Sequence, residues 1–280
     1  MIEGMADIDT PTIALNDGAS IPQLGLGVYK VPDDEAETVV ATALEAGYRH
    51  LDTASFYGNE GGVGRAMRAS GVPRDEVFLT TKVWNTDHGY DETLRAFDLS
   101  LETLGTDHVE LYLIHWPAPR QDRYVETYRA LERIREEGRA RSIGVSNFQV
   151  HHLERLLGET GVVPAVDQVE AHPWLQQREL RAFADAHGIV TEAWSPLARG
   201  RILDDPTLLR LADEHGVSTA QVVIRWHLQQ GLVVIPKSVT PSRIRSNADV
   251  FGFELSDDDL AAIASLDSGQ RTGSHPDDNG

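Results

Sequence analysis

Lysine is scarce in this chain, and its three copies are the first candidates for chemistry. Lys30, Lys82 and Lys237 are the only lysines among 25 basic residues, and the others are arginines. An ammonium is a compact point charge, whereas a guanidinium is a planar fork. A chain that uses arginine for nearly every other cation is expected to retain lysine where a compact charge is needed, although compositional bias alone could leave the same three.

The other candidates are oxygen and nitrogen groups, because the chain has no cysteine. Thiolate nucleophiles, disulfides and cysteine metal sites are therefore excluded, and any redox chemistry must come from a bound cofactor. His50, Asp52 and His115 could be metal ligands of a barrel hydrolase, since His50 and Asp52 share a strand face. Such a site needs more ligands, and Lys82 would be a poor neighbour for a cation. The sequence therefore predicts no metal site.

Short apolar, β-branched runs alternate eight times with segments of helical period, which predicts parallel strands joined by helices. Eight such units fit a closed (β/α)8 TIM barrel, whereas an open doubly wound sheet would more often stop at five or six strands. The predicted strands are 23–28, 49–52, 77–82, 109–115, 142–145, 165–169, 190–194 and 232–236. Helices are predicted at 91–104, 123–137, 178–187 and 219–229, among others.

The sequence predicts a single domain of residues 1–280, with additional elements of secondary structure at both ends of the chain. An Asn16-Asp17-Gly18 turn between two apolar runs predicts an N-terminal β-hairpin that plugs the bottom of the barrel. Extra helices are expected after the last strand, at 241–247 and 256–266, and the carboxylates of Asp257–Asp259 suit a helix N-terminus better than a metal site. Residues 268–280 form a polar tail whose composition is typical of a mobile segment.

Catalytic groups of such barrels project from the C-terminal ends of the strands. All three lysines fall at those ends, which favours a functional reason for their retention. The polar and aromatic residues at or just after the predicted strand ends are Lys30, Asp52, Tyr57, Lys82, His115, Ser146, Asn147, Gln168, Trp194 and Lys237.

Composition and missing motifs exclude several classes of function. The formal net charge of −19 would repel nucleic acid. No run approaches the ~20 apolar residues of a membrane span, and the first residues lack the pattern of a secretory signal, so a cytoplasmic protein is expected. No G-x-G-x-x-G, P-loop, H-E-x-x-H or G-x-S-x-G motif occurs. A nicotinamide cofactor, if bound, would not bind by the Rossmann route.

Seven segments together resemble the aldo-keto reductase superfamily, most closely its bacterial 2,5-diketo-D-gluconate reductases. The resemblance runs from about residue 12 to residue 266, with the segments in the family's order. They are GYRHLDTASFYGNEGGVGRA from Gly47, TKVW from Thr81, LYLIHWP from Leu111, RSIGVSNF from Arg141, VDQVEAHPW from Val166, AWSPLARG from Ala193 and IPKSVTPSRIRSN from Ile235.

The resemblance implies a catalytic tetrad of Asp52, Tyr57, Lys82 and His115, with no substitution. Tyr57 would be the general acid that protonates the alkoxide formed by hydride transfer from NADPH. One cation about 4 Å away contributes roughly 4 kcal/mol, or about three pKa units, so Lys82 is expected to lower the pKa of Tyr57. Asp52 would keep the ammonium charged and aimed, and His115 would orient the substrate carbonyl.

The cofactor residues also follow from the resemblance. Ser146, Asn147 and Gln168 would bind the nicotinamide carboxamide, and Trp194, a tyrosine in many relatives, would stack on the ring. Ser195, Pro196 and Leu197 continue that segment. Lys237, Ser238 and Arg243, at the start of a helix with Thr240 as its N-cap, form a cationic pocket for the 2′-phosphate, so NADPH should be preferred over NADH. Asn247 would contact adenine, although Ser246 replaces a glutamate common in relatives.

The expected activity is therefore NADPH-dependent reduction of an aldehyde or ketone to an alcohol by a monomer. Tyr29, Trp84, His115, Trp116 and the tail are expected to line the substrate pocket. Lys30 there could favour an anionic substrate, such as the keto sugar acid 2,5-diketo-D-gluconate, or could be a solvated surface lysine. The alternative is a cofactor-binding regulatory barrel with weak reductase activity.

Overall fold

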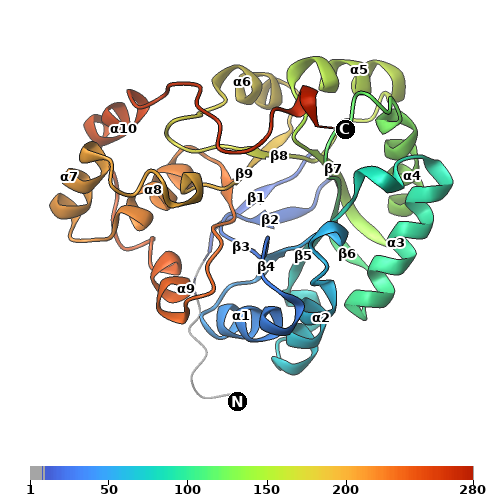
Figure 1. The fold of residues 1–280 in the computed structure, drawn as a ribbon, viewed down its shortest axis with the longest axis horizontal. Coiled ribbons are helices and arrows are strands. Elements are labelled where there is room, and N and C mark those ends of the chain that lie inside the picture. The colour runs from blue at the N-terminus through green and yellow to red at the C-terminus, as the bar shows by residue number, and fades with distance from the viewer. Residues whose placement is uncertain (1–7, 9, 280) are drawn as a thin grey trace.

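Eight parallel strands curl into one sheet whose order, β3 to β10, follows the order of the chain (Figure 1). The computed structural model describes residue 8 and residues 10–279. The sheet closes where Leu24 pairs with Val234 in parallel. Gly25 N donates to Val234 O at 2.9 Å, and Val234 N donates to Gln23 O at 2.9 Å. The predicted (β/α)8 barrel is confirmed.

The strands of the barrel lie within a few residues of their predicted positions. They are β3 (Leu26–Gly27), β4 (His50–Asp52), β5 (Phe78–Val83), β6 (Val109–Ile114), β7 (Ala140–Ser146), β8 (Val166–Glu170), β9 (Val190–Trp194) and β10 (Val233–Val234). The first and last are shorter than predicted, because at the closing seam the ladder is reduced to a single bridge and a few backbone hydrogen bonds.

The helices surround the sheet (Figure 1). They are α1 (Asp33–Glu45), α2 (Glu60–Ala69), α3 (Tyr90–Leu104), α4 (Tyr124–Glu136), α5 (Val150–Thr160), α6 (Arg178–Ala186), α7 (Pro206–His215), α8 (Thr219–Gln229), α9 (Pro241–Ala248) and α10 (Asp257–Ala264). Ser256 caps α10, and Asp259 completes the capping box, so the acidic triplet opens a helix as predicted.

The N-terminal hairpin plugs the bottom of the barrel, as predicted. Strands β1 (Thr12–Ala14) and β2 (Ser20–Pro22) pair antiparallel around a turn in which Gly18 has φ +91°. Its buried side chains Leu15 and Ile21 pack against residues at or near the first positions of the barrel strands, including Phe78, Val166 and Val233. The bottom of the barrel is therefore filled with apolar side chains, and the polar groups lie at the other end.

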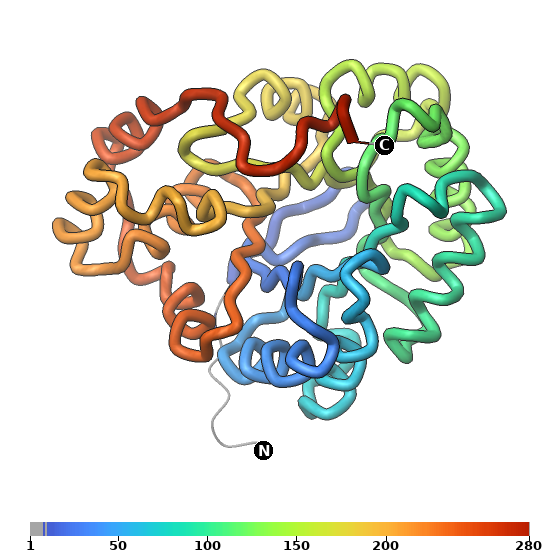
Figure 2. Tube along the Cα trace, viewed as in Figure 1, coloured from blue at the N-terminus to red at the C-terminus, as the bar shows by residue number. Residues whose placement is uncertain are grey.

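Residues 268–279 of the C-terminal tail pack against the barrel instead of standing free. In Figure 2 their red trace runs from the end of α10 across the barrel toward α5. Glu170, the last residue of β8, accepts hydrogen bonds from Thr272 N at 2.6 Å, Thr272 Oγ1 at 2.5 Å and Gly273 N at 3.1 Å. The composition of this segment predicts mobility, but the buried carboxylate of Glu170 holds its backbone in place.

Among residues 8 and 10–279, none of the helices is long and apolar enough to cross a bilayer.

Substitution by alanine should have opposite effects on stability at two helical glycines. A Cβ at Gly64 in α2 would lie 2.0 Å from Leu104 O, whereas a Cβ at Gly158 in α5 would meet no atom within 4 Å. Gly64→Ala should destabilise the protein by about 1–3 kcal/mol or more through overpacking. Gly158→Ala, the matched control, should stabilise it by about 0.5–1 kcal/mol through the entropy of the unfolded chain. Denaturant unfolding measures both, and a Gly64→Ala variant as stable as wild type would contradict the packing described.

Candidate active site

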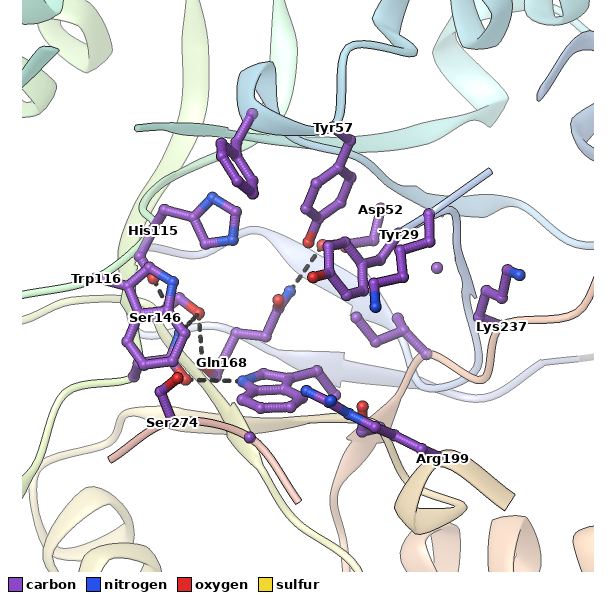
Figure 3. Close-up of a pocket in the computed structure, with 18 of the residues that line it drawn as sticks. Tyr29, Asp52, Tyr57, His115, Trp116, Ser146, Gln168, Arg199, Lys237 and Ser274 are labelled. Carbon is purple, nitrogen blue, oxygen red and sulfur yellow. Dashed lines mark hydrogen bonds between the residues drawn. The ribbon is translucent and has the colours of Figure 1, made fainter. Parts of the chain in front are cut away.

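A cavity of about 550 Å³ opens at the C-terminal ends of the strands, where the sequence predicts the site. Figure 3 shows Tyr57, His115 and Gln168, from three different parts of the chain, pointing into it. Most of the predicted site residues line the cavity: Tyr29, Lys30, Asp52, Tyr57, Trp84, His115, Trp116, Ser146, Asn147, Gln168, Trp194, Ser195, Pro196, Leu197 and Lys237.

A buried ion pair lies beneath this cavity. Lys82 Nζ is 2.7 Å from both Asp52 Oδ1 and Asp52 Oδ2, and it also donates to Thr53 O at 2.9 Å. The Lys82 side chain is fully buried. All three hydrogens of the ammonium are therefore used, as a charge buried in a barrel core requires. This closed geometry explains why Lys82 itself does not line the cavity.

Tyr57 stands next to the ion pair, in the short helix η1 (Ser55–Tyr57) after β4. Lys82 Nζ lies 5.3 Å from the centre of its ring. Burial raises the pKa of Tyr57 well above its usual value, and the negative charge of Asp52 adds to the effect. The expected lowering of this pKa by Lys82 is therefore wrong for the protein alone, because burial outweighs the ammonium and the charge of Asp52 adds to the rise. Tyr57 keeps its proton at neutral pH, as a proton donor must.

His115 follows β6 and faces Tyr57 across the cavity. Its ring centre lies 5.5 Å from that of Tyr57 and 5.0 Å from that of Trp84. Burial lowers the pKa of His115 well below its usual value, and Lys82 lowers it further. The imidazole is therefore neutral at neutral pH and has one N–H to donate.

Gln168 joins the ion pair to a carboxyl group that sequence reasoning missed. Its Nε2 donates to Asp52 Oδ2 at 2.7 Å and to Glu192 Oε2 at 2.9 Å. Burial raises the pKa of Glu192 to about 8, and Asp52 contributes. A glutamate in the middle of the apolar β9 was the signal in the sequence, since an unpaired carboxylate is rarely buried.

Hydrogen bonds also link Ser146, Asn147 and Trp194. Asn147 Nδ2 donates to His115 O at 2.9 Å, and Trp194 Nε1 donates to Asn147 Oδ1 at 2.9 Å. Ser146 Oγ donates to Gln168 O at 2.7 Å. Asn147 has φ +64°, a left-handed conformation that asparagine tolerates well. The polar groups are thereby fixed in place around the indole of Trp194.

The predicted phosphate pocket is only partly inside the cavity. Lys237 lines it, whereas Ser238, Arg243 and Asn247 do not and lie in or just before α9. Thr240 is the N-cap residue of α9 with Pro241 after it, and its N–H donates to Ser238 Oγ at 3.1 Å. Lys237 and Arg243 have no carboxylate oxygen within 4.0 Å among the described residues, although the protein is strongly acidic. Two uncompensated cations thus flank a helix N-terminus.

Aromatic side chains form one wall of the cavity. The predicted Trp84 stacks on Phe56, which sequence reasoning missed, with ring centres 3.7 Å apart. Tyr29 lies 5.0 Å from Tyr57, and Trp116 lies 6.5 Å from Trp194. Phe56 is half exposed and directly precedes Tyr57 in η1. The only indication of its role in the sequence was this position next to Tyr57.

The tail completes the wall, as expected. Gly273, Ser274 and Asn279 line the cavity. A Cβ at Gly273 would lie 2.6 Å from Trp194 Cη2, so only glycine lets the backbone approach the indole this closely. Sequence reasoning missed two further residues of the site. Glu170 ends β8 and holds the tail. Arg199 lines the cavity and has a positive φ of +57°.

The ligand set considered for a metal hydrolase does not assemble. Among residues 8 and 10–279, His151, His152 and Asp277 form the only group of three His, Asp or Glu side chains close enough to share an ion. His50, Asp52 and His115 are not such a group. Gln149 N donates to His152 Nδ1 at 3.1 Å, which leaves the ring proton of a neutral His152 on Nε2, the nitrogen that faces Asp277. That proton opposes metal binding there.

Residues 22–268 match the sequence model of the aldo/keto reductase family. The chain belongs to this family. It is 57% identical over 267 residues to an aldo-keto reductase of Mycolicibacterium smegmatis, covering 95% of this chain and 97% of that protein. It is 51% identical to the glyoxal reductase of Bacillus subtilis, with 95% and 96% of the two chains covered. The methylglyoxal reductase DkgA of Escherichia coli K12 is also 51% identical, with 96% and 98% covered.

Solved structures agree with this membership. A mutant of Gox0644 in complex with NADPH superposes with a TM-score of 0.92 at 50% identity, covering 96% of this chain and 98% of that one. An aldo/keto reductase from Brucella melitensis gives 0.91 at 55% identity, covering 94% and 100%.

Weakening the attachment of the tail should open one wall of the cavity. Burial would raise the pKa of Glu170, but hydrogen bonds from His172, Thr272 and Gly273 outweigh it and lower this pKa to about 2. Glu170→Gln removes the charge and one acceptor, so the Thr272 and Gly273 amides should exchange hydrogen at least tenfold faster, since a hydrogen bond to a charged group contributes about 1.5–3 kcal/mol. Hydrogen-exchange mass spectrometry of residues 268–279 measures this.

The control is Glu179→Gln, at an exposed glutamate in α6. It should leave exchange in the tail unchanged. Because the pKa of Glu170 is lowered, its contribution is present above the unfolded pKa of about 4.3 and is lost as the pH falls through about 2. Equal protection of the tail in Glu170→Gln and wild type at pH 7 would refute this role.

Proposed function

We propose that this protein reduces aldehydes and ketones to alcohols with NADPH, with Tyr57 as the proton donor. The observation that carries the proposal is the placement of a protonated Tyr57 and a neutral His115 on one cavity, 5.5 Å apart between ring centres, above the Asp52–Lys82 pair. The names of the relatives, glyoxal and methylglyoxal reductases, point the same way.

The residues present suit the nicotinamide end of NADPH. Trp194 offers a flat aromatic face next to Asn147 and Ser146. Gln168 Nε2 is held by two carboxyl groups, while Gln168 Oε1 makes no hydrogen bond to any described residue and is available to accept an amide N–H. When bound, the cofactor supplies a hydride for the carbonyl carbon.

The phosphate end fits the positions around α9. Lys237 and Arg243 provide charge, and the first amides of the helix provide donors for a 2′-phosphate. In a protein of net charge −19, a site for this anion needs such local cations. The NADPH-bound relative of the same fold supports this cofactor.

Tyr57 and His115 would then act on the substrate oxygen. The neutral His115 donates a hydrogen bond that orients the carbonyl, and the Tyr57 hydroxyl transfers its proton to the oxygen as negative charge develops there. The resulting phenolate is stabilised by Lys82, whose position Asp52 holds.

Small dicarbonyls are the substrate class that we propose first. Tyr29, Phe56, Trp84 and Trp116 make a largely aromatic pocket, and the two relatives named above are glyoxal and methylglyoxal reductases. One observation favours a second class, an anionic keto sugar acid such as 2,5-diketo-D-gluconate. Lys30 lines the cavity, and its Nζ lies 5.4 Å from the ring centre of Tyr29. Relative kcat/KM for methylglyoxal and the keto acid, in wild type and Lys30→Met, separates the two classes.

Removing the proton donor tests the assignment of Tyr57. Tyr57→Phe should lower kcat for methylglyoxal by ~100-fold or more, the usual cost of lost acid catalysis, and should leave the NADPH dissociation constant and the fold unchanged. Lys82→Arg should also be impaired, because a planar fork cannot make the three contacts of the ammonium. Near-normal turnover of Tyr57→Phe would end the assignment. A wild type that binds NADPH but reduces no carbonyl would instead favour a cofactor-binding regulatory barrel.

Cofactor preference tests the phosphate pocket. Arg243→Ala should lower kcat/KM for NADPH roughly tenfold or more and change that for NADH little, since a charge-assisted hydrogen bond contributes ~1.5–3 kcal/mol. Arg245→Ala is the matched control, because Arg245 is in the same helix and lies 3.8 Å from Glu45. Steady-state kinetics with both cofactors give the ratio. Equal use of NADH by the wild type, or equal losses in the two variants, would rule out this pocket.

A further inference from the structure

Glu192 is a fully buried carboxyl group that the proposed reaction does not use. It lies in β9 with Val233 of β10 as its neighbour in the sheet. Its Oε2 accepts a hydrogen bond from Gln168 Nε2 at 2.9 Å. Its Oε1 is buried without a hydrogen bond, 3.5 Å from His50 Nε2.

The charges around Glu192 do not balance if it is ionised. Lys82 is the one cation of this cluster, and its three hydrogens go to the two oxygens of Asp52 and to Thr53 O. Gln168 Nε2 lies between the two carboxyl groups and gives one hydrogen to each. A second carboxylate here would be a buried charge with no cation, which is strongly unfavourable.

The contacts of His50 supply a place for a proton. His50 Nδ1 lies 3.3 Å from Pro22 O, an acceptor only, so the ring hydrogen belongs on Nδ1 and Nε2 is left as an acceptor. Thr80 Oγ1 and Glu192 Oε1 face Nε2 at 3.3 Å and 3.5 Å. A protonated Glu192 can therefore donate Oε1–H to His50 while its other oxygen accepts from Gln168.

We propose that Glu192 is a positioning residue of the active site that works in its protonated form, between His50 and Gln168, and so keeps the Asp52–Lys82 pair beside Tyr57 free of excess negative charge. This inference rests on the proposed role of Tyr57 as proton donor. It also gives Gln168 a defined orientation, with Nε2 toward the carboxyl groups and Oε1 left for the nicotinamide carboxamide.

The titration behaviour agrees with this geometry. Burial, and then the charge of Asp52, raises the pKa of Glu192 to about 8. Burial lowers the pKa of His50 to about 3, so the imidazole does not take the proton. An ionised Glu192 would raise the pKa of Tyr57 further. The phenolate left by proton transfer would then be less stable, and reduction should slow as the pH rises through 8.

The kinetic experiment compares wild type, Glu192→Gln and Glu60→Gln. Single-turnover reduction of methylglyoxal is followed from pH 6.5 to 9.5 with saturating NADPH. Because burial raises the pKa of Glu192 to about 8, the wild-type rate should fall between pH 7 and pH 9 as Glu192 loses its proton. Glu192→Gln, which cannot ionise, should lose this decline. Glu60→Gln should keep it, because Glu60 is buried but bonds Thr81 and Ser100.

The second experiment needs no cofactor and no activity. Infrared difference spectra of the protein between pH 7 and pH 9 should show loss of a protonated-carboxyl carbonyl band in wild type and in Glu60→Gln, and no such loss in Glu192→Gln. If Glu192→Gln does not fold, Glu192→Met, of similar length and without a titrating group, takes its place in both experiments.

The outcomes separate the two levels of inference. Absence of the band from the wild type, or a Glu192 variant that retains the wild-type decline above pH 8, overturns the role of Glu192. A wild type that reduces no carbonyl overturns the proposed function. In that case the infrared titration still decides whether Glu192 is protonated, so the two failures are distinguishable.

Discussion

The buried ion pair between Asp52 and Lys82 is the constraint on which the rest of the site depends. An ammonium can be held at the core of a barrel only if every N–H has an acceptor, and Asp52 with Thr53 O satisfies that condition. Once Asp52 is committed to Lys82, its second oxygen also takes the amide of Gln168. One pair of charges thus positions Gln168 and, through it, contacts Glu192, and Tyr57 lies beside the same pair.

The protonation states in this cluster differ from those expected when only one charged neighbour is considered. Lys82 viewed alone should acidify Tyr57, yet the pKa of Tyr57 is raised, first by burial and then by the negative charge of Asp52. Burial then dominates for Tyr57, His115 and Glu192 and favours the neutral form of each. The cavity therefore has neutral donors at its surface and one compensated pair of charges beneath them.

Much of this architecture could be predicted from the sequence because barrel strands are short apolar runs with polar residues at their ends. The strands and the residues at or just after their predicted ends, such as Asp52, His115 and Gln168, were found in this way. Glu192 and Glu170 were not, since their partners are distant in sequence: Gln168 for the first, Thr272 for the second. Pairings of this kind depend on the three-dimensional register and leave no local pattern.

The attachment of the tail has a consequence for the order in which the protein is made. The residues that finish the cavity wall, Gly273, Ser274 and Asn279, follow all eight strands in the chain, whereas their anchor, Glu170, lies far upstream. As synthesis proceeds from the N-terminus, the last strand and the closing seam emerge before the segment that covers Trp194. A nascent chain that has reached residue 267 therefore contains the eight strands of the barrel, while the Gly273 that packs against Trp194 is still to be added.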